Sequence, residues 1–243
     1  MDRATYDRMA EIDRDHWWFV ARRGIIARLI ERYRPRPGPL RILEVGAGTG
    51  SNLELLMRYG QVDAIEPDDG ARGFAEARSG LKLKGGYLPD VPLDDGAYDL
   101  IVLLDVLEHI PDDIGALSYL RGKLAPGGRL LLTVPGSPWM WSAHDVAHHH
   151  QRRYTTARLR QVVGAAGFAP RFWTHFNSIL FPLIAAVRVA GKLLGKDGDD
   201  DKMPSRPVNA ALRTIFGAER HWAARLNVPF GVSMAMVAEP TIR

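Results

Sequence analysis

Short apolar runs alternate with helical patterns along most of the chain. The runs predict strands at 41–46, 61–67, 81–88, 98–105, 128–135, 168–176 and 231–240. Helical patterns occur at 52–59, 69–78, 112–124 and 155–166. Strands that alternate with helices are typical of a parallel sheet with crossover helices. The pattern therefore predicts an α/β protein with a doubly wound, seven-stranded, mostly parallel sheet.

Two segments lie outside this alternation. Residues 1–38 show one or two amphipathic helical patterns before a proline-rich link, which predicts a helical cap. Residues 176–229 contain two further helical patterns, at 176–195 and 208–226. We expect a single domain, 1–243, divided into the cap 1–38, a ligand-binding core 39–175, a helical insertion 176–229 and a final strand 230–243.

The first pattern of the insertion, 176–195, raises the question of a membrane. It is interrupted by Arg188 and Lys192, and a bilayer span needs roughly 20 apolar residues. Two interpretations stay open, a peripheral helix on a membrane surface or over the substrate, and plain core packing. The acidic stretch 196–202 lacks the glycine and glutamate that complete a calcium loop, so we expect a solvated loop there.

Composition and charge narrow the class of protein. Hydrophobic residues make up 46% of the 243 residues and charged residues 25%, which are ordinary globular values. The chain has no cysteine, which suits a reducing compartment, and its start lacks the apolar segment of a secretory signal. The net charge of +4 is dispersed rather than clustered. We therefore expect a cytoplasmic protein without a nucleic-acid partner.

The stretch "ILEVGAGTG", residues 42–50, carries the first chemical signal. A strand that runs through a glycine turn into a helix places backbone N–H groups beside a helix N-terminus. The stretch lacks the lysine of a phosphate-binding P-loop, and Ser51 stands where a dinucleotide fingerprint has its third glycine. The carboxylate of Glu44 favours a ligand that carries a positive charge.

Four motifs then follow in order, "LEVGAGTG", "AIEPD", "YDLIVLLDVLEHI" and "LAPGGRLLLTVP". Together they resemble class I S-adenosylmethionine-dependent methyltransferases, particularly the branch similar to ubiquinone and menaquinone biosynthesis methyltransferases. The resemblance implies a Rossmann-like fold with an antiparallel last strand and S-adenosyl-L-methionine as cofactor, but it does not supply the acceptor. We expect a small-molecule or lipid-linked acceptor that is methylated at oxygen. The alternatives are an NAD-dependent oxidoreductase on the same architecture and a non-catalytic cofactor-binding partner protein.

The same resemblance implies which residues hold the cofactor. The glycine turn resembles the loop beneath the methionine portion, and Glu66 resembles the acid that binds both ribose hydroxyls. Tyr87 and Leu88 occupy the adenine side, where many relatives carry an aspartate. The expected cofactor set is Glu44, Gly46, Ala47, Gly48, Gly50, Asn52, Glu66, Pro67, Tyr87, Leu88, Asp105, Val106 and His109.

Glu108 and His109 raise the alternative of a divalent-cation site. Asp105, Glu108 and His109 could share a helical face, and they resemble residues near which related quinone O-methyltransferases hold a divalent cation. A helix cap and local hydrogen bonds explain these residues more simply, so no metal is expected.

The histidine-rich segment 144–150 has three interpretations: a base, a metal site through His144 and His148, or a polar loop. A hydroxyl acceptor must lose its proton, so a base within hydrogen-bond reach is needed for O-methylation. His144 with Asp145 is therefore the candidate catalytic pair.

Overall fold

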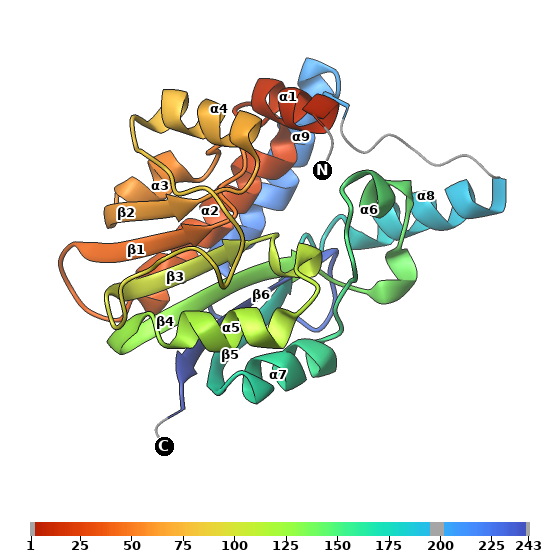
Figure 1. Ribbon diagram of the computed structural model, residues 1–243. Coiled ribbons are helices and arrows are strands. Elements are labelled where there is room, and N and C mark those ends of the chain that lie inside the picture. Colours follow the sequence, from red (N-terminus) through yellow and green to blue (C-terminus); the bar gives the residue numbers. More distant parts are fainter. Residues whose placement is uncertain (1–2, 195–201, 242–243) are drawn as a thin grey trace.

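The computed structural model describes residues 3–194 and 202–241, in which six strands form one sheet with the order β2-β1-β3-β4-β6-β5 (Figure 1). The strands are β1 (Leu40–Val45), β2 (Gly60–Ile65), β3 (Tyr98–Leu104), β4 (Leu124–Pro135), β5 (Phe168–Phe176) and β6 (Ser233–Pro240). The pairs β1–β2, β1–β3 and β3–β4 are parallel, whereas β6 runs antiparallel to both β4 and β5. The expected α/β class, the mostly parallel sheet and the antiparallel last strand are confirmed.

The seventh strand expected at 81–88 is not confirmed. Within the described residues this segment pairs with β2 only through an isolated parallel bridge between Ile65 and Lys84. The next two residues are Gly85, which lies against the Arg72 guanidinium, and Gly86, whose φ of +117° lies outside the range of an L residue in a strand. The chain therefore leaves the sheet edge after a single pairing.

The described helices are α1 (Arg3–Ile12), α2 (Trp17–Tyr33), α3 (Leu53–Met57), α4 (Asp69–Ser79), α5 (Asp113–Arg121), α6 (Ala143–Ala147), α7 (Thr156–Ala165), α8 (Phe181–Leu194) and α9 (Arg206–Ala218). Short 3₁₀ turns are η1 (Leu107–His109), η2 (Pro138–Met140) and η3 (Glu219–His221). Side-chain caps explain why several helices begin close to the expected residue, since Asp68, Asp112 and Thr155 each accept a hydrogen bond from the first turn of α4, α5 and α7.

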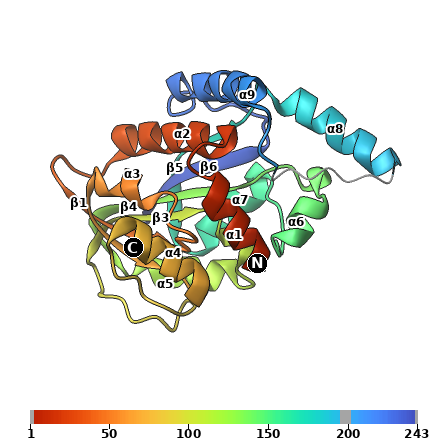
Figure 2. The ribbon, with the colours of Figure 1, turned by 90° about the horizontal axis from the view of Figure 1, so that it is seen from above.

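Helices cover both faces of the sheet (Figures 1 and 2). Side chains of α2, α3 and α9 pack with one face, and those of α5 and α7 pack with the other. Central strands therefore bury both of their sides, as Ile42 and Leu43 of β1 do in the two separate cores. This double burial explains the nearly continuous apolar runs in the sequence.

The insertion between β5 and β6 contains two helices, but with different bounds from those expected. The first expected helix, 176–195, begins only at Phe181, because β5 continues to Phe176 and Asn177 then adopts a φ of +56°. The second ends at Ala218 and passes into η3. Among the described helices none is long and apolar enough to cross a membrane. The acidic loop expected at 196–202 lies outside the described residues except for Lys202.

Candidate active site

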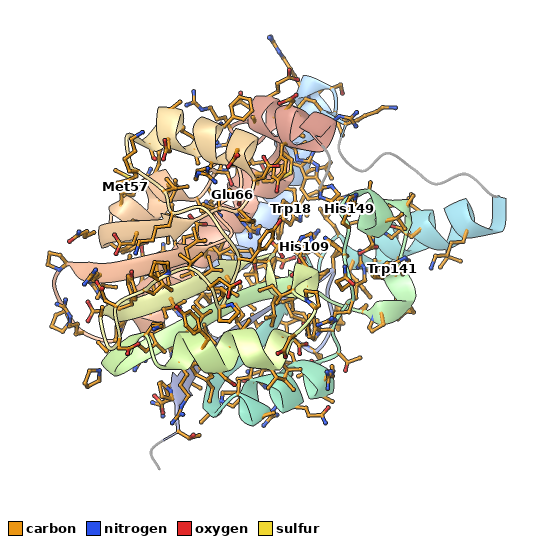
Figure 3. The ribbon with its side chains drawn as sticks, in the orientation of Figure 1. Trp18, Met57, Glu66, His109, Trp141 and His149 are labelled. Atoms are coloured by element: carbon orange, nitrogen blue, oxygen red, sulfur yellow. The ribbon has the colours of Figure 1, made fainter. Side chains whose placement is uncertain are left out.

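A cavity of about 1320 Å³ opens where β1, β2, β3 and β4 end. The carboxyl ends of neighbouring parallel strands meet at one edge of a sheet, and the loops that follow them surround a common space. Figure 3 shows Glu66, Trp18, His109 and His149 gathered at this edge, whereas Met57 lies far from it. Further walls come from α1, from the start of α2, from α8 and from the segment 144–153.

Most of the expected site residues line this cavity. They are Gly46, Ala47, Gly48, Asn52, Glu66, Pro67, Tyr87, Leu88, Asp105, Val106, His109 and His144. Glu44, Gly50 and Asp145 lie outside the lining, and each contacts a residue that belongs to it. We call the part around Gly48 and Glu66 the glycine end, and the part around His109, His144, His148 and His150 the histidine end.

The three glycines of the turn are needed for different structural reasons. A Cβ on Gly46 would lie 2.6 Å from Cγ2 of Val106, so the end of β3 requires a glycine there. A Cβ on Gly48, whose φ is +54°, would meet nothing within 4 Å, so its main chain borders open space. Gly50 instead packs against Ala75 of α4. Of these three glycines, only Gly48 leaves room for a ligand against bare backbone.

Glu66 connects the glycine turn to the end of β2. One carboxylate oxygen accepts a hydrogen bond from the Gly48 amide at 2.7 Å, and the other accepts one from the Asp68 amide at 3.0 Å. Burial raises the pKa of Glu66, and the two amide hydrogen bonds oppose that rise. The Tyr6 hydroxyl of α1 also donates to this carboxylate. A hydroxyl-bearing ligand therefore finds acceptor oxygens here, one of which a phenol of the chain itself already uses.

Arg22 of α2 joins the strand ends to the helical cap, and the sequence analysis did not identify it. Its guanidinium lies 2.5 Å from Asp105 and donates to Asn52 and Thr133, both at 3.2 Å. Asn52 in turn donates to Glu44 at 2.9 Å. Arg22 follows Trp18 by one helical turn, within the apolar stripe of α2, and a charged residue in such a stripe was the available signal.

Glu44 lies at the inner end of this network. Burial raises its pKa to about 7, while the Asn52 hydrogen bond and the nearby Arg22 charge oppose the rise. The side chain is fully buried and reaches the cavity only through Asn52. The structure therefore places Glu44 behind the cavity wall, one residue removed from the lining.

Histidines from two segments form the opposite end of the cavity. The rings of His109 and His150 lie 4.8 Å apart, and those of His144 and His148 lie 4.1 Å apart. The expected pair, His144 and Asp145, lies in α6, which a capping box between Ser142 and Asp145 starts. The segment 144–150 is thus an ordered wall rather than a plain loop.

Asp145 does not face the cavity but holds other residues in place. Its Oδ1 lies 2.8 Å from Nδ1 of His150 and accepts a hydrogen bond from Arg153 at 2.7 Å. Burial works to raise the pKa of Asp145, but the contacts with His150 and Arg153 outweigh it and leave the pKa well below its usual range. These contacts tie Asp145 to His150, which belongs to the expected histidine-rich segment, and to Arg153.

Two of the imidazoles at this end, those of His109 and His150, have lowered pKa values. Burial lowers the pKa of His109 to about 3, and the neighbouring His150 lowers it further. Burial also lowers the pKa of His150, against the opposing effect of Asp145. Neutral imidazoles keep a nitrogen lone pair that can accept a proton or bind a metal ion.

Comparisons with known proteins agree with this geometry. The model of a family described as "Methyltransferase domain" matches residues 18–171, more than half of the chain. The chain belongs to this family of methyltransferase domains. The match includes Arg22, the glycine turn, Glu66 and His150.

Curated relatives carry consistent names. A protein of Mycolicibacterium smegmatis named a probable S-adenosylmethionine-dependent methyltransferase is 27% identical over 158 residues, which cover 63% of this chain and 60% of that protein. A ubiquinone biosynthesis O-methyltransferase of Xanthomonas axonopodis pv. citri is 30% identical over 173 residues, covering 65% of this chain and 64% of that protein. The chain thus spans less than two thirds of the length of these relatives.

Solved structures share the fold. A methyltransferase complexed with the Trm112 methyltransferase activator of Haloferax volcanii aligns with a TM-score of 0.61 at 18% identity, covering 99% of this chain and 98% of that one. Phosphoethanolamine N-methyltransferase 2 of Haemonchus contortus, in complex with S-adenosyl-L-methionine, aligns with a TM-score of 0.58 at 15% identity, covering 88% of this chain and 51% of that one. The expected class, an S-adenosylmethionine-dependent methyltransferase, is confirmed, and the dehydrogenase and non-enzyme alternatives are not favoured.

Proposed function

We propose that this protein transfers a methyl group from S-adenosylmethionine to a hydroxyl group of a small-molecule or lipid-linked acceptor. The observation that supports this most is the cavity that connects Glu66 and the Gly48 main chain to the histidine end, where burial lowers the pKa of His109 and of His150. When bound at the glycine end, the cofactor would supply a methyl group on a cationic sulfur. The acceptor oxygen would bond to that methyl carbon as the carbon–sulfur bond breaks, and its hydroxyl proton would pass to His144.

The residues at the glycine end fit this cofactor. The open space at Gly48 admits a ligand against the main chain, and Glu66 presents oxygens for the ribose hydroxyls. Tyr6 then shares the Glu66 carboxylate with the sugar or moves aside. Tyr87 and Leu88 flank the adenine side, while Asp105, held by Arg22, and Val106 form the floor at the end of β3.

Methylation at oxygen is supported by the histidine end. A hydroxyl needs a proton acceptor, whereas an unprotonated amine does not. We propose that His144, which lines the cavity, accepts the proton of the hydroxyl group. Asp145 positions the surrounding wall through its contacts with His150 and Arg153. The names of the Xanthomonas and Methylocella silvestris relatives, both ubiquinone biosynthesis O-methyltransferases, favour the same chemistry.

A lipid-linked acceptor is supported by the surface beside the cavity. Ile184 and Arg188 of α8 line the cavity, whereas Leu183 and Val187 on the same helix are 60% and 58% exposed. Figure 1 shows α8 extending away from the sheet next to α6. We propose that this helix rests on a membrane surface, so that a lipid-linked acceptor enters from the bilayer.

The first experiment identifies what the protein holds. Small molecules released from the purified chain are analysed by mass spectrometry, and S-adenosylmethionine or S-adenosylhomocysteine is the expected finding. Recovery of NAD would contradict the proposal. Matched pairs of acceptors that differ only in a hydroxyl or an amine then test the methylated atom, and preferential methylation of the amine would reject the assignment to oxygen.

A further inference from the structure

Two arginines from distant parts of the chain, Arg153 and Arg188, line the histidine end of the cavity. Arg153 lies at the sheet edge, because the next residue, Tyr154, bridges to Gly136 directly after β4. Arg188 reaches the cavity from α8. Burial lowers the pKa of Arg153 most, Asp145 opposes this, and the charge of Arg188 lowers the pKa further. The two guanidinium groups are therefore close enough to repel each other, and an anion in the cavity would offset that repulsion.

The guanidinium of Arg153 is fixed in position on two of its three nitrogens. The residue is 7% exposed, its Nε donates to Oδ1 of Asp145 at 2.7 Å, and its Nη1 donates to the Gly136 carbonyl at 3.1 Å. Its Nη2 makes no hydrogen bond with another of the described residues. A guanidinium is a planar fork, so two fixed nitrogens also fix the third. Arg153 therefore offers the cavity a cationic donor that needs no further ordering.

Arg188 is attached to the loop that follows β4. Its Nη1 donates to the Met140 carbonyl of η2 at 2.9 Å. Lys192, one turn later on α8, makes a similar contact with the Trp139 carbonyl at 2.9 Å, but it does not belong to the cavity lining. Of these two cations on α8, only Arg188 borders the cavity.

The acids at this end do not balance the two arginines. Asp145 serves two neighbours with one oxygen, which accepts from Arg153 and lies 2.8 Å from Nδ1 of His150. Burial, and then the nearby charge of Asp105, raise the pKa of Glu108 well above its ordinary value, which favours the uncharged acid. The two arginines and Asp145 together carry a net positive charge, so the electrostatic field of these residues attracts an anion.

We propose that Arg153 and Arg188 bind an anionic group of the methyl acceptor, either a carboxylate or a phosphate ester. This inference rests on the proposed function, in which the cofactor occupies the glycine end and the acceptor the histidine end. Guanidinium groups bind carboxylates and phosphates through charge-assisted hydrogen bonds from paired N–H donors. The acceptor is then a hydroxyl compound that also carries an acid group. Its anion fixes the molecule at the two arginines, and its hydroxyl lies at the same end of the cavity as His144.

The first experiment compares probes that differ in the anionic group. Calorimetry is carried out on protein saturated with S-adenosylhomocysteine. Phenyl phosphate and benzoate are each compared with phenol, and dioctanoyl phosphatidic acid, below its critical micelle concentration, is compared with dioctanoylglycerol. We expect an anionic probe to bind at least about ten-fold more tightly than its neutral partner. A preference within the soluble set indicates a free acid, and one confined to the lipid pair indicates a lipid headgroup.

Substitutions on α8 locate the preference. Arg188→Met should reduce the ratio of anionic to neutral affinity to within about three-fold, because one of the two cations is lost. Arg188→Lys keeps the charge without the fork and should retain part of the ratio. Lys192→Met is the matched control, since it removes an exposed cation from the same helix, and it should leave the ratio unchanged.

Three results would overturn the anion site. The first is that no anionic probe binds the wild type more tightly than its neutral partner, which includes the case that none binds with a Kd below about 10 mM. The second is that Arg188→Met keeps the wild-type ratio. The third is that Lys192→Met lowers the ratio as much as Arg188→Met does. Circular dichroism checks the fold of each variant, and Arg188→Gln replaces Arg188→Met if the latter does not fold.

Cofactor binding separates this inference from the proposed function. Arg188→Met should bind S-adenosylhomocysteine as tightly as the wild type, and with an acceptor that turns over it should raise KM while kcat stays within about three-fold. If the wild type binds S-adenosylhomocysteine but shows no preference for anions, the anion site fails and the methyltransferase stands. If the wild type does not bind S-adenosylhomocysteine, the proposed function fails, whatever the probes show.

Discussion

The glycine end and the histidine end of the cavity are built in different ways. At the glycine end, the turn after β1 and the acid after β2 come from paired neighbouring strands, with Val45 opposite Ile65, and the Gly48 amide meets Glu66 directly. At the histidine end, η1 meets the segment after α6, and Arg152 reaches Ile110 across 42 positions of sequence. The first arrangement follows from strand pairing alone, and the second depends on where a long connection folds back.

The difference implies a division of labour. The glycine end has bare main chain and an acid already held by amides, which suits holding a ligand in place. The histidine end has the imidazoles of His109 and His150, whose pKa values burial lowers, and the fully buried carboxylate of Glu108, which suits proton transfer. Substitutions at the two ends should therefore affect different measurements.

The largest effect is expected at His144. His144→Gln should lower kcat for a hydroxyl acceptor by about 10²- to 10⁴-fold, because a positioned base is lost, and leave S-adenosylhomocysteine affinity unchanged. Steady-state kinetics and calorimetry measure the two quantities, with His221→Gln as the control. A kcat within about three-fold of wild type would remove His144 as the base.

Substitution of Arg22 tests how much its buried network of an ion pair and two hydrogen bonds contributes to stability. Arg22→Met should lower the free energy of unfolding by about 3 kcal/mol, because Asp105 loses its ion-pair partner and Asn52 and Thr133 lose hydrogen bonds. Urea denaturation measures this. Arg28→Met on the same helix removes an exposed ion pair with Glu31 and should cost less than about 1 kcal/mol. Equal losses in both variants would mean that the buried network adds nothing.

Glu66 tests the glycine end alone. Glu66→Ala should weaken S-adenosylhomocysteine binding by about 2 kcal/mol, roughly 30-fold, since hydrogen bonds to a charged group are lost. Calorimetry measures the affinity, and Glu54→Ala on the exposed side of α3 is the control. An unchanged affinity would discard the ribose role.

Glu44 should give the smallest effect, and one that depends on pH. Its pKa is about 7 in the folded protein, against 4.5 as the ordinary value, so the folded state holds the extra proton between these two values. Wild-type stability should therefore fall relative to Glu44→Gln as pH rises from 5 to 7, by about 1 to 2 kcal/mol. Parallel urea titrations at both pH values measure it, and a constant difference between the variants would show that Glu44 does not titrate there.

The order of strands and crossover helices along the chain and the family could be predicted from the sequence, and most of the site residues predicted from it line the cavity. Apolar runs indicate strands that are buried on both faces of the sheet. Residues that directly follow parallel strands lie at the same edge of the sheet. The segment 81–88 was not confirmed as a strand, because Gly85 and Gly86 turn it away after one bridge at Lys84. Glycines can permit a strand or a turn, and in the folded chain Gly85 lies against the Arg72 guanidinium.

The sequence alone determined that a glycine turn and an acid lie at the ends of adjacent strands, because both follow from the period of the pattern, and from this we predict a nucleotide-type ligand there. Tertiary structure alone decided which charges face each other. It paired Arg22 with Asp105, turned Asp145 toward His150 and left Glu108 beside two imidazoles. Electrostatic partners are chosen by distances of a few ångströms between segments far apart in the chain, and no local pattern encodes those distances.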